Sequence, residues 1–309
     1  MTDKEHVPVL LDPVLAGLNI RTDGCYVDGT FGRGGHSSAI LERLDSAGRL
    51  LAIDRDPQAI ARVDEALLSD TRFELVQGEF GELKKHAFER KLLGTVDGLL
   101  LDLGVSSPQL DEAARGFSFR ADGPLDMRMD PSSGISAASW LEQVGERELK
   151  RVLAELGEER FAGRIARAVV TARTVTPVRT TRELADIVRS VVPERGQRKN
   201  PATKTFQAIR IFVNNELEQL ERALEAALEL LRPGGRLCVI SFHSLEDRRV
   251  KRFMRDASQE PEQYRGLPVI PQEYRPRLRR IGKLATAGAA EVAANVRARS
   301  ARLRVAERL

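Results

Sequence analysis

The chain has 309 residues, of which 42% are hydrophobic and 30% are charged, with 24 glycines and 14 prolines. These proportions exclude collagen-like and wholly disordered proteins, and they predict a soluble protein with a hydrophobic core. No apolar run reaches the roughly 18 residues that a membrane helix needs. The N-terminus lacks a basic and then apolar signal region. We therefore expect a cytoplasmic protein with no membrane contact.

Charge is unevenly distributed along the chain, although the formal net charge is only +4. Residues 1–106 carry 12 basic and 18 acidic side chains, whereas residues 232–309 carry 18 basic and 8 acidic ones. Most of the basic residues are arginines, whose planar guanidinium suits phosphate groups. This asymmetry is typical of a protein that binds a polyanion, although an arginine-rich genome would produce the same composition.

The first third of the chain alternates short apolar runs with helical patterns. The runs lie at 25–28, 49–54, 73–76 and 96–103, and apolar residues recur at helical spacing between them. This alternation predicts parallel strands that are buried on both faces and joined by right-handed crossover helices.

The pattern changes in the middle of the chain. Residues 105–135 are rich in Gly, Pro, Ser and Asp, which predicts a loop. Three apolar stripes at helical spacing follow before about residue 215, and the third begins with the capping box Thr180–Glu183. These stripes predict a small helical insertion.

Strand patterns then return. A long helix should end at the turn 232–235, followed by a strand at 236–242 and two short strands at 277–285 and 301–309. We therefore predict an α/β protein with a Rossmann-like sheet. Its sheet domain should comprise residues 1–106 and 216–309, and an all-helical subdomain should comprise residues 107–215.

A glycine-rich loop, residues 28–36, follows the first predicted strand and opens a helix. Its glycines allow a ligand to approach the backbone, and the start of the helix suits an anionic group. The loop does not match the G-x-G-x-x-G register of dinucleotide sites, which disfavours NAD.

Asp54 ends the second strand, where an acid can accept both hydroxyls of a ribose. The alternative role, capping the next helix, fits Asp56 better. Phe80 could pack on an adenine or belong to the core.

Three acids, Asp28, Asp54 and Asp102, fall at the carboxyl ends of predicted strands, where open α/β sheets bind ligands. Such an acidic site repels a pyrophosphate and suits the sulfonium cation of S-adenosylmethionine. The methyl donor is therefore the favoured cofactor.

The segment from Asp102 to Gln109 follows the fourth strand and is where the acceptor of the methyl group is expected. An exocyclic amine of a base is a poor nucleophile, because its lone pair is delocalised into the ring. Hydrogen-bond acceptors on its N–H groups would assist the attack, and Ser106, Ser107 and Pro108 can supply hydroxyl and carbonyl oxygens from a stiffened turn. Taken alone, these residues would be better interpreted as an ordinary Ser/Pro turn.

Nine segments together carry a resemblance to a known family. They are residues 6–11, 28–37, 52–60, 99–111, 115–130, 157–168, 200–217, 231–255 and 295–308. In this order they resemble the bacterial 16S rRNA (cytosine-N4)-methyltransferases, the MraW or RsmH family, over nearly the whole chain.

The resemblance implies a class I methyltransferase fold with an inserted helical substrate domain. It implies methyl transfer to N4 of a cytidine in the decoding region of small-subunit rRNA. The cofactor contacts that it implies are Gly34, Gly35, His36, Asp54, Phe80, Asp102 and Gln109. Asp102, Ser106, Ser107 and Pro108 are the candidate catalytic residues.

Other segments have open interpretations. Phe117, Phe119 and nearby arginines (115, 120, 128) could hold a flipped base and its phosphates, or merely pin their own loop. The basic residues Arg195, Arg198, Lys199 and Lys204 are expected to contact phosphate, and the alternative is a solvated linker. His243, at the end of a predicted strand, is a further catalytic candidate, while Ser244 should cap the next helix. We expect no metal site, and Cys25 and Cys238 should be buried hydrophobes.

Two other classes of function remain open: a nonenzymatic RNA-binding protein with a vestigial fold, and a DNA amino-methyltransferase. The DNA enzymes usually have a second proline where this chain has Gln109. The expected partner is 16S rRNA, in the assembled small subunit or free, and a homodimer is left open.

Overall fold

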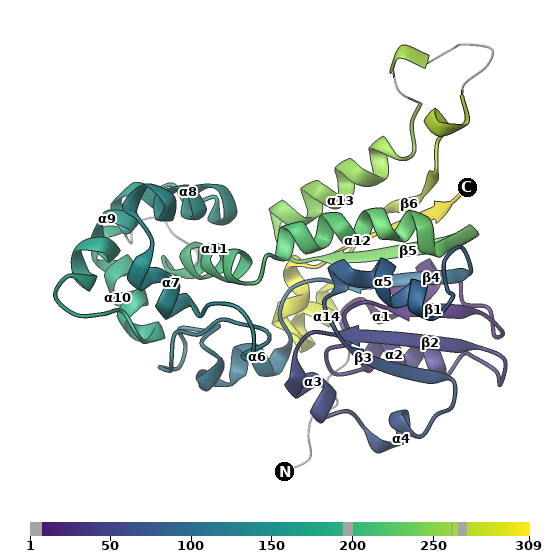
Figure 1. Cartoon of the computed structure of the whole chain (residues 1–309), viewed down its shortest axis with the longest axis horizontal. Helices are drawn as coiled ribbons and strands as arrows, with labels where there is room; N and C mark the ends of the chain where they lie inside the picture. The colour runs from purple at the N-terminus through teal and green to yellow at the C-terminus, as the bar shows by residue number, and fades with distance from the viewer. Residues whose placement is uncertain (1–7, 194–199, 261, 265–270) are drawn as a thin grey trace. The chain divides into compact units, whose positions relative to one another are not determined.

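The computed structural model describes residues 8–193, 200–260, 262–264 and 271–309. The chain divides into two compact units (Figure 1). Unit 1 comprises Met1–Gly104 and Leu217–Leu309, and unit 2 comprises Val105–Glu216. These limits differ by one or two residues from the limits expected for the sheet domain and the insertion.

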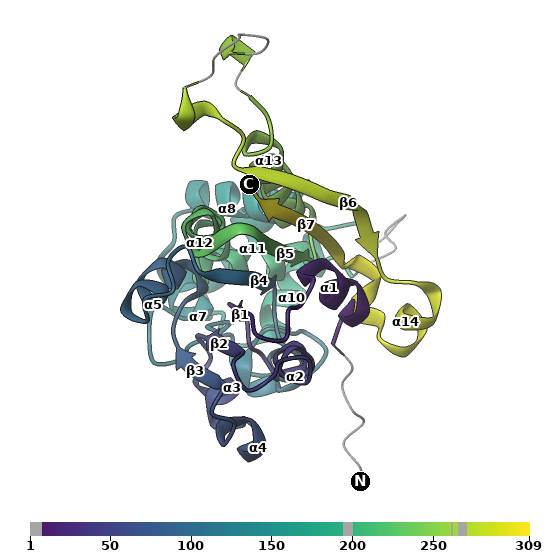
Figure 2. The same ribbon diagram turned by 90° about the vertical axis from the view of Figure 1, so that its right-hand side faces the viewer.

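Unit 1 contains a seven-stranded sheet in the order β3-β2-β1-β4-β5-β7-β6, which Figure 2 shows side by side. The strands are β1 Cys25–Asp28, β2 Arg49–Asp54, β3 Phe73–Gln77, β4 Val96–Asp102, β5 Leu231–Ser241, β6 Leu278–Thr286 and β7 Arg302–Arg308. Strands β1 to β5 are parallel, and β7 is antiparallel to both neighbours. The predicted Rossmann-like sheet is confirmed.

Helices cover both faces of this sheet, as the nearly continuous apolar strands require. One face packs against α5, α12 and α13, and the other packs against α1 and α2. The helices of unit 1 are α1 Leu11–Leu18, α2 Gly35–Leu41, α3 Pro57–Ala61, α4 Glu65–Leu68, α5 Leu83–Glu89, α12 Glu216–Leu230, α13 Ser244–Asp256 and α14 Ala289–Ala294. No helix in the described part of the chain is long and apolar enough to cross a membrane.

The strand order creates a topological switch point between β1 and β4. From β1 the chain moves outward to β2 and β3, and it then returns to form β4 on the other side of β1. In open parallel sheets, ligands bind at the carboxyl ends of the strands at such a point. Asp28, Asp54 and Asp102 are the last residues of β1, β2 and β4, so the topology gathers them at this edge.

Two strands are interrupted. In β5, Leu231 lies opposite Val96 and Arg236 lies opposite Gly98, so the predicted turn 232–235 bulges out between them. In β6, the outermost strand, the register breaks between Ile281 and Ala285.

Unit 2 is helical and has its own hydrophobic core. Its helices are α6 Ser107–Asp111, α7 Ala137–Gln143, α8 Glu146–Gly157, α9 Ala162–Arg173, α10 Thr181–Val191 and α11 Thr203–Val213. The three predicted stripes form the buried faces of α8, α9 and α10, and the capping box Thr180–Glu183 is present. The loop predicted at 105–135 is wrong in part, because it contains α6 and a 3-10 turn at Ala113–Arg115.

Candidate active site

Asp54 fixes the start of the glycine-rich loop. Its Oδ2 accepts the amide of Gly32 at 2.7 Å, and its Oδ1 accepts the amide of Asp56 at 2.8 Å. Burial raises the pKa of Asp54 to about 6, although both amide bonds favour the charged form. Asp56 caps α3 by accepting the amide of Gln58, as the sequence predicted. Asp54 is therefore not the cap, and its carboxylate ends β2 at the carboxyl edge of the sheet.

The loop between β1 and α2 needs its glycines. Gly34 has φ +77°, and a Cβ there would come within 2.7 Å of the Phe31 ring. A Cβ on Gly35 would collide with the ring of Pro8. Any side chain at these positions would push the loop outward, so Gly34 and Gly35 keep this backbone close to the sheet edge.

Asp28 connects the ends of β1 and β4. Its Oδ2 accepts the hydroxyl of Ser37 at 2.7 Å, and its Oδ1 accepts the amide of Thr30 at 3.1 Å. The Thr30 hydroxyl in turn accepts the amide of Asp102 at 2.6 Å. Burial raises the pKa of Asp28, and the neighbouring His36 opposes this rise. This network holds Asp102 in a fixed position.

Asp102 has an unsatisfied carboxyl oxygen. Its side chain is 25% exposed, but Oδ1 is buried and has no hydrogen-bond partner in the described part of the chain. Burial raises the pKa of Asp102 well above its usual range, and the charges of Asp28 and Glu246 raise it further. A buried acceptor surrounded by acids favours a cationic or hydrogen-donating ligand.

His36 lies between the N-terminal segment and Asp102. Its Nε2 is 3.1 Å from the carbonyl oxygen of Val9, which can only accept, so Nε2 carries the proton. Its Nδ1 is 3.6 Å from Oδ2 of Asp102. Burial lowers the pKa of His36, so Nδ1 presents a lone pair to the carboxyl. A proton on Asp102, or a ligand donor, would relieve this contact.

Phe80 begins a 3-10 turn after β3 and is half-buried against the core that also contains α5. Part of its ring thus remains accessible. Its contact with an adenine stays a prediction.

Known proteins resemble this chain in sequence and in fold. The sequence profile of the MraW methylase family matches residues 3–309. The protein belongs to this family. Three solved structures are also similar over most of the chain, with low identity. A proposed rRNA methylase from Clostridium thermocellum is 12% identical and has a TM-score of 0.43, and the match covers 97% of this chain and 93% of that one. TrmN from Thermus thermophilus is 12% identical with a TM-score of 0.43, and the match covers 97% of this chain and 48% of that one. SMU.1697c from Streptococcus mutans, a proposed methyltransferase in complex with SAH, is 12% identical with a TM-score of 0.41, and the match covers 98% of this chain and 100% of that one. The sequence match shows the family, and the strand order shows the fold.

In this MraW family member, the Ser-Ser-Pro segment is the start of a helix. Ser106 and Gln109 form a capping box around α6, in which the Gln109 side chain accepts the amide of Ser106 at 3.0 Å. Pro108 lies in the first turn, where its missing N–H costs nothing. Gln109 is buried, so the structure gives it a local role; its contact with the cofactor stays a prediction.

The loop at 115–130 is held mainly by its own core. Phe117 and Arg115 are buried, and the Arg115 guanidinium donates to the carbonyl of Met129 at 2.8 Å. Phe119 packs edge-on against Phe206. For Phe117 and Arg115 the structure therefore supports the alternative that they pin the loop, because neither reaches the surface.

His243, and not Ser244, caps α13. Its Nδ1 accepts the amide of Glu246 at 3.3 Å, and its Nε2 lies 3.1 Å from the Glu246 carboxylate. His243 takes the cap position because the Glu246 carboxylate, three residues later, accepts the backbone amide of His243 and so completes a capping box. Three of the predicted phosphate contacts, Arg195, Arg198 and Lys199, lie outside the described residues.

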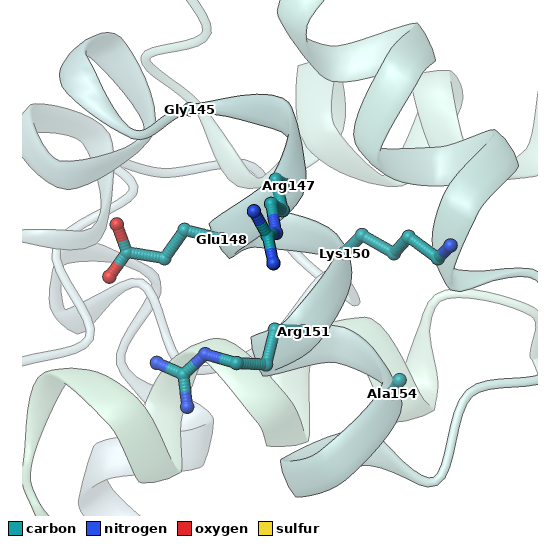
Figure 3. A pocket seen from close by; sticks show the side chains of 6 residues that line it. All are labelled: Gly145, Arg147, Glu148, Lys150, Arg151 and Ala154. Atoms are coloured by element: carbon teal, nitrogen blue, oxygen red, sulfur yellow. The ribbon is translucent and has the colours of Figure 1, made fainter.

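A surface hollow in unit 2 has none of the predicted site residues in its lining. Figure 3 shows its lining, which comes from α8 and the residue before it: Gly145, Arg147, Glu148, Lys150, Arg151 and Ala154. These side chains are exposed and spread outward, so the hollow lacks the convergent, buried polar groups of the β1–β4 edge.

Proposed function

We propose that the protein is a cytoplasmic methyltransferase that transfers the methyl group of S-adenosylmethionine to the exocyclic N4 amine of a cytidine. The proposed target lies in the decoding region of 16S rRNA, within the small ribosomal subunit. The observation that carries this proposal is the Asp102 carboxyl at the switch point. It is fixed, surrounded by acids and left with one unsatisfied oxygen. Membership of a methylase family supplies the reaction class.

The residues at the sheet edge fit the cofactor. Asp54 offers the carboxylate that the two ribose hydroxyls need, and each of its oxygens, though bonded to an amide, can accept again. Asp28 and Asp102 make the edge favourable for a cation. When bound, the cofactor supplies an electrophilic methyl group on a positively charged sulfur.

The protein residues assist the amine at the other side of the reaction. Asp102, Ser106, Ser107 and Pro108 would accept hydrogen bonds from the N–H groups and so localise the nitrogen lone pair. The N–C bond then forms while the C–S bond breaks, and the sulfur retains the bonding electron pair. The excess amine proton leaves to an acceptor or to water. Positioning alone can lower such a barrier by roughly 7–11 kcal/mol.

One assay tests the proposed function. The purified protein is incubated with labelled S-adenosylmethionine and with 16S rRNA, assembled small subunits or duplex DNA, and the nucleosides are then analysed by mass spectrometry. We expect N4-methylcytidine from RNA. Label in DNA alone would identify a DNA amino-methyltransferase, and binding of RNA without transfer would identify a nonenzymatic protein.

Ser106→Ala and Pro108→Ala should each lower the single-turnover rate about 10- to 100-fold, with little change in cofactor affinity, because they disturb the acceptor side of the reaction. The matched control is Thr180→Ala, which removes the same kind of capping box from α10. Both cap losses should cost about 1 kcal/mol of stability. If the Ser106 and Thr180 variants lost equal fractions of the single-turnover rate, Ser106 would act only as a helix cap.

The double variant Cys25→Ala, Cys238→Ala should remain active. Methylation of a ring carbon would need a thiolate nucleophile, but burial raises the pKa of Cys25 to about 11 and raises that of Cys238 further. Both thiols therefore stay protonated at neutral pH. A folded but inactive double variant, or a 5-methylcytidine product, would refute attack by the exocyclic amine.

A further inference from the structure

Helix α13 has a stripe of cations on its outer face. Arg248, Lys251, Arg252 and Arg255 are all exposed, whereas Val250 and Met254 on the opposite face are buried against the sheet. The spacing of three and four residues places these cations next to one another along the helix. We call these four residues the α13 stripe.

Two of the three acids of α13 are buried away from this stripe. Glu246 is buried and accepts the amide of Phe242 at 2.7 Å. Asp247 is also buried, where Arg304 and Arg302 donate to it at 2.7 and 2.9 Å. Asp256, at the end of the helix, pairs with Arg255.

The stripe costs the helix stability in isolation. Like charges three or four residues apart on a helix repel each other, and four such pairs occur within the α13 stripe. A merely solvated face would gain from alternating signs. An anionic partner is the feature that would make this arrangement favourable.

The position of α13 relates the stripe to the reaction. The helix follows β5, in which Ile240 lies opposite Asp102. The charge of Glu246, in the first turn of α13, contributes to the raised pKa of Asp102. From this end, α13 extends for about 20 Å and diverges from α12 along its length (Figure 1). The stripe thus leads away from the edge that holds the candidate site.

We propose that the α13 stripe binds the phosphodiester backbone of the RNA substrate and holds the strand that leads to the acceptor nucleotide. This inference rests on the proposed function. Three of the four cations are arginines, which match phosphate geometry. A membrane surface fits less well, because the apolar residues of α13 face the sheet and leave no exposed apolar face to insert.

The test compares two quadruple variants that lose the same charge. The stripe variant carries Arg248→Gln, Lys251→Gln, Arg252→Gln and Arg255→Gln. The control carries Arg21→Gln, Arg43→Gln, Lys84→Gln and Lys85→Gln, which are exposed residues elsewhere in unit 1. Binding to in-vitro-transcribed 16S rRNA is measured at several salt concentrations, together with cofactor affinity, thermal stability, and KM and kcat on small subunits.

We expect the stripe variant to bind RNA at least tenfold more weakly, with a salt slope reduced by up to about 3. Its KM for small subunits should rise, while kcat and cofactor affinity stay unchanged and the melting temperature rises slightly, because the repulsion within the stripe is removed. Equal losses in the control would show a net-charge effect only and would overturn the proposal, as would unchanged RNA binding. Stripe-dependent binding to phosphatidylserine vesicles without RNA binding would also overturn it. If the wild-type protein transfers no methyl group to RNA, the proposed function fails, and the binding comparison still decides the role of the stripe.

Discussion

Asp102→Asn is expected to lower the single-turnover rate of methyl transfer about 10²–10³-fold while the folded protein becomes more stable at pH 7. The rate falls because the variant replaces the carboxyl acceptor at the switch point with a weaker amide acceptor. Stability rises because burial and the charges of Asp28 and Glu246 raise the pKa of Asp102, an unfavourable shift that Asn does not have. The Asn amide can also donate toward Nδ1 of His36, where the carboxylate presents only a lone pair.

The sign of the stability effect follows from the direction of the pKa shift. The folded-state pKa of Asp102 is raised above its unfolded value, so its contribution to stability is complete below about pH 4 and is lost as the pH rises through the folded-state pKa. Asn does not titrate, so the advantage of the variant should grow with pH in urea unfolding. The matched control is Asp97→Asn on the same strand, which removes an ion pair with Arg232. It should lose stability and keep its rate. If Asp102→Asn destabilises the protein as Asp97→Asn does, our description of the Asp102 environment is wrong.

Asp54→Asn should weaken S-adenosylmethionine binding about 100-fold, because each hydrogen bond to a charged acceptor contributes roughly 1.5–3 kcal/mol. The neighbouring variant Asp56→Asn provides the control, since Asn caps a helix as well as Asp does. Calorimetry should show near-normal affinity for the control. If the two folded variants bound S-adenosylmethionine equally well, Asp54 would not be a cofactor contact.

The affinity for the cofactor should also depend on pH. The pKa of Asp54 is raised to about 6 in the free protein, and the ribose contact favours the ionised form. Binding must then release a proton at low pH, so affinity should fall below pH 6, by up to tenfold per pH unit. Calorimetry in buffers of different ionisation enthalpy measures this release. Asp54→Asn should abolish it; an unchanged pH profile in that variant would assign the titration to another group.

The sheet and its acids were predictable because they rest on local patterns. Nearly continuous apolar runs gave β1 and β2 their limits, and the acid that ends each run falls at the ligand edge through topology alone. The helical stripes of unit 2 were equally clear, since each helix must bury one face.

Features that depend on partners distant in sequence were not predictable. The contact of His36 with Asp102, and of its other nitrogen with Val9, arises only when three segments meet. The burial of Phe117 likewise depends on helices formed later in the chain. The capping box at Ser106 and Gln109 was different, because its sequence signal was present and the surrounding turn residues obscured it.

The outermost strand, β6, has a consequence for assembly. An edge strand offers unpaired N–H and C=O groups to any other strand that can align with it. Here the alignment is broken between Ile281 and Ala285, and Gly282 at φ +66° bends the edge. Arg280 and Lys283 are exposed on the same strand, so a second copy would bring like charges together. This edge thus disfavours pairing with a further strand and so reduces aggregation by sheet extension at high protein concentration.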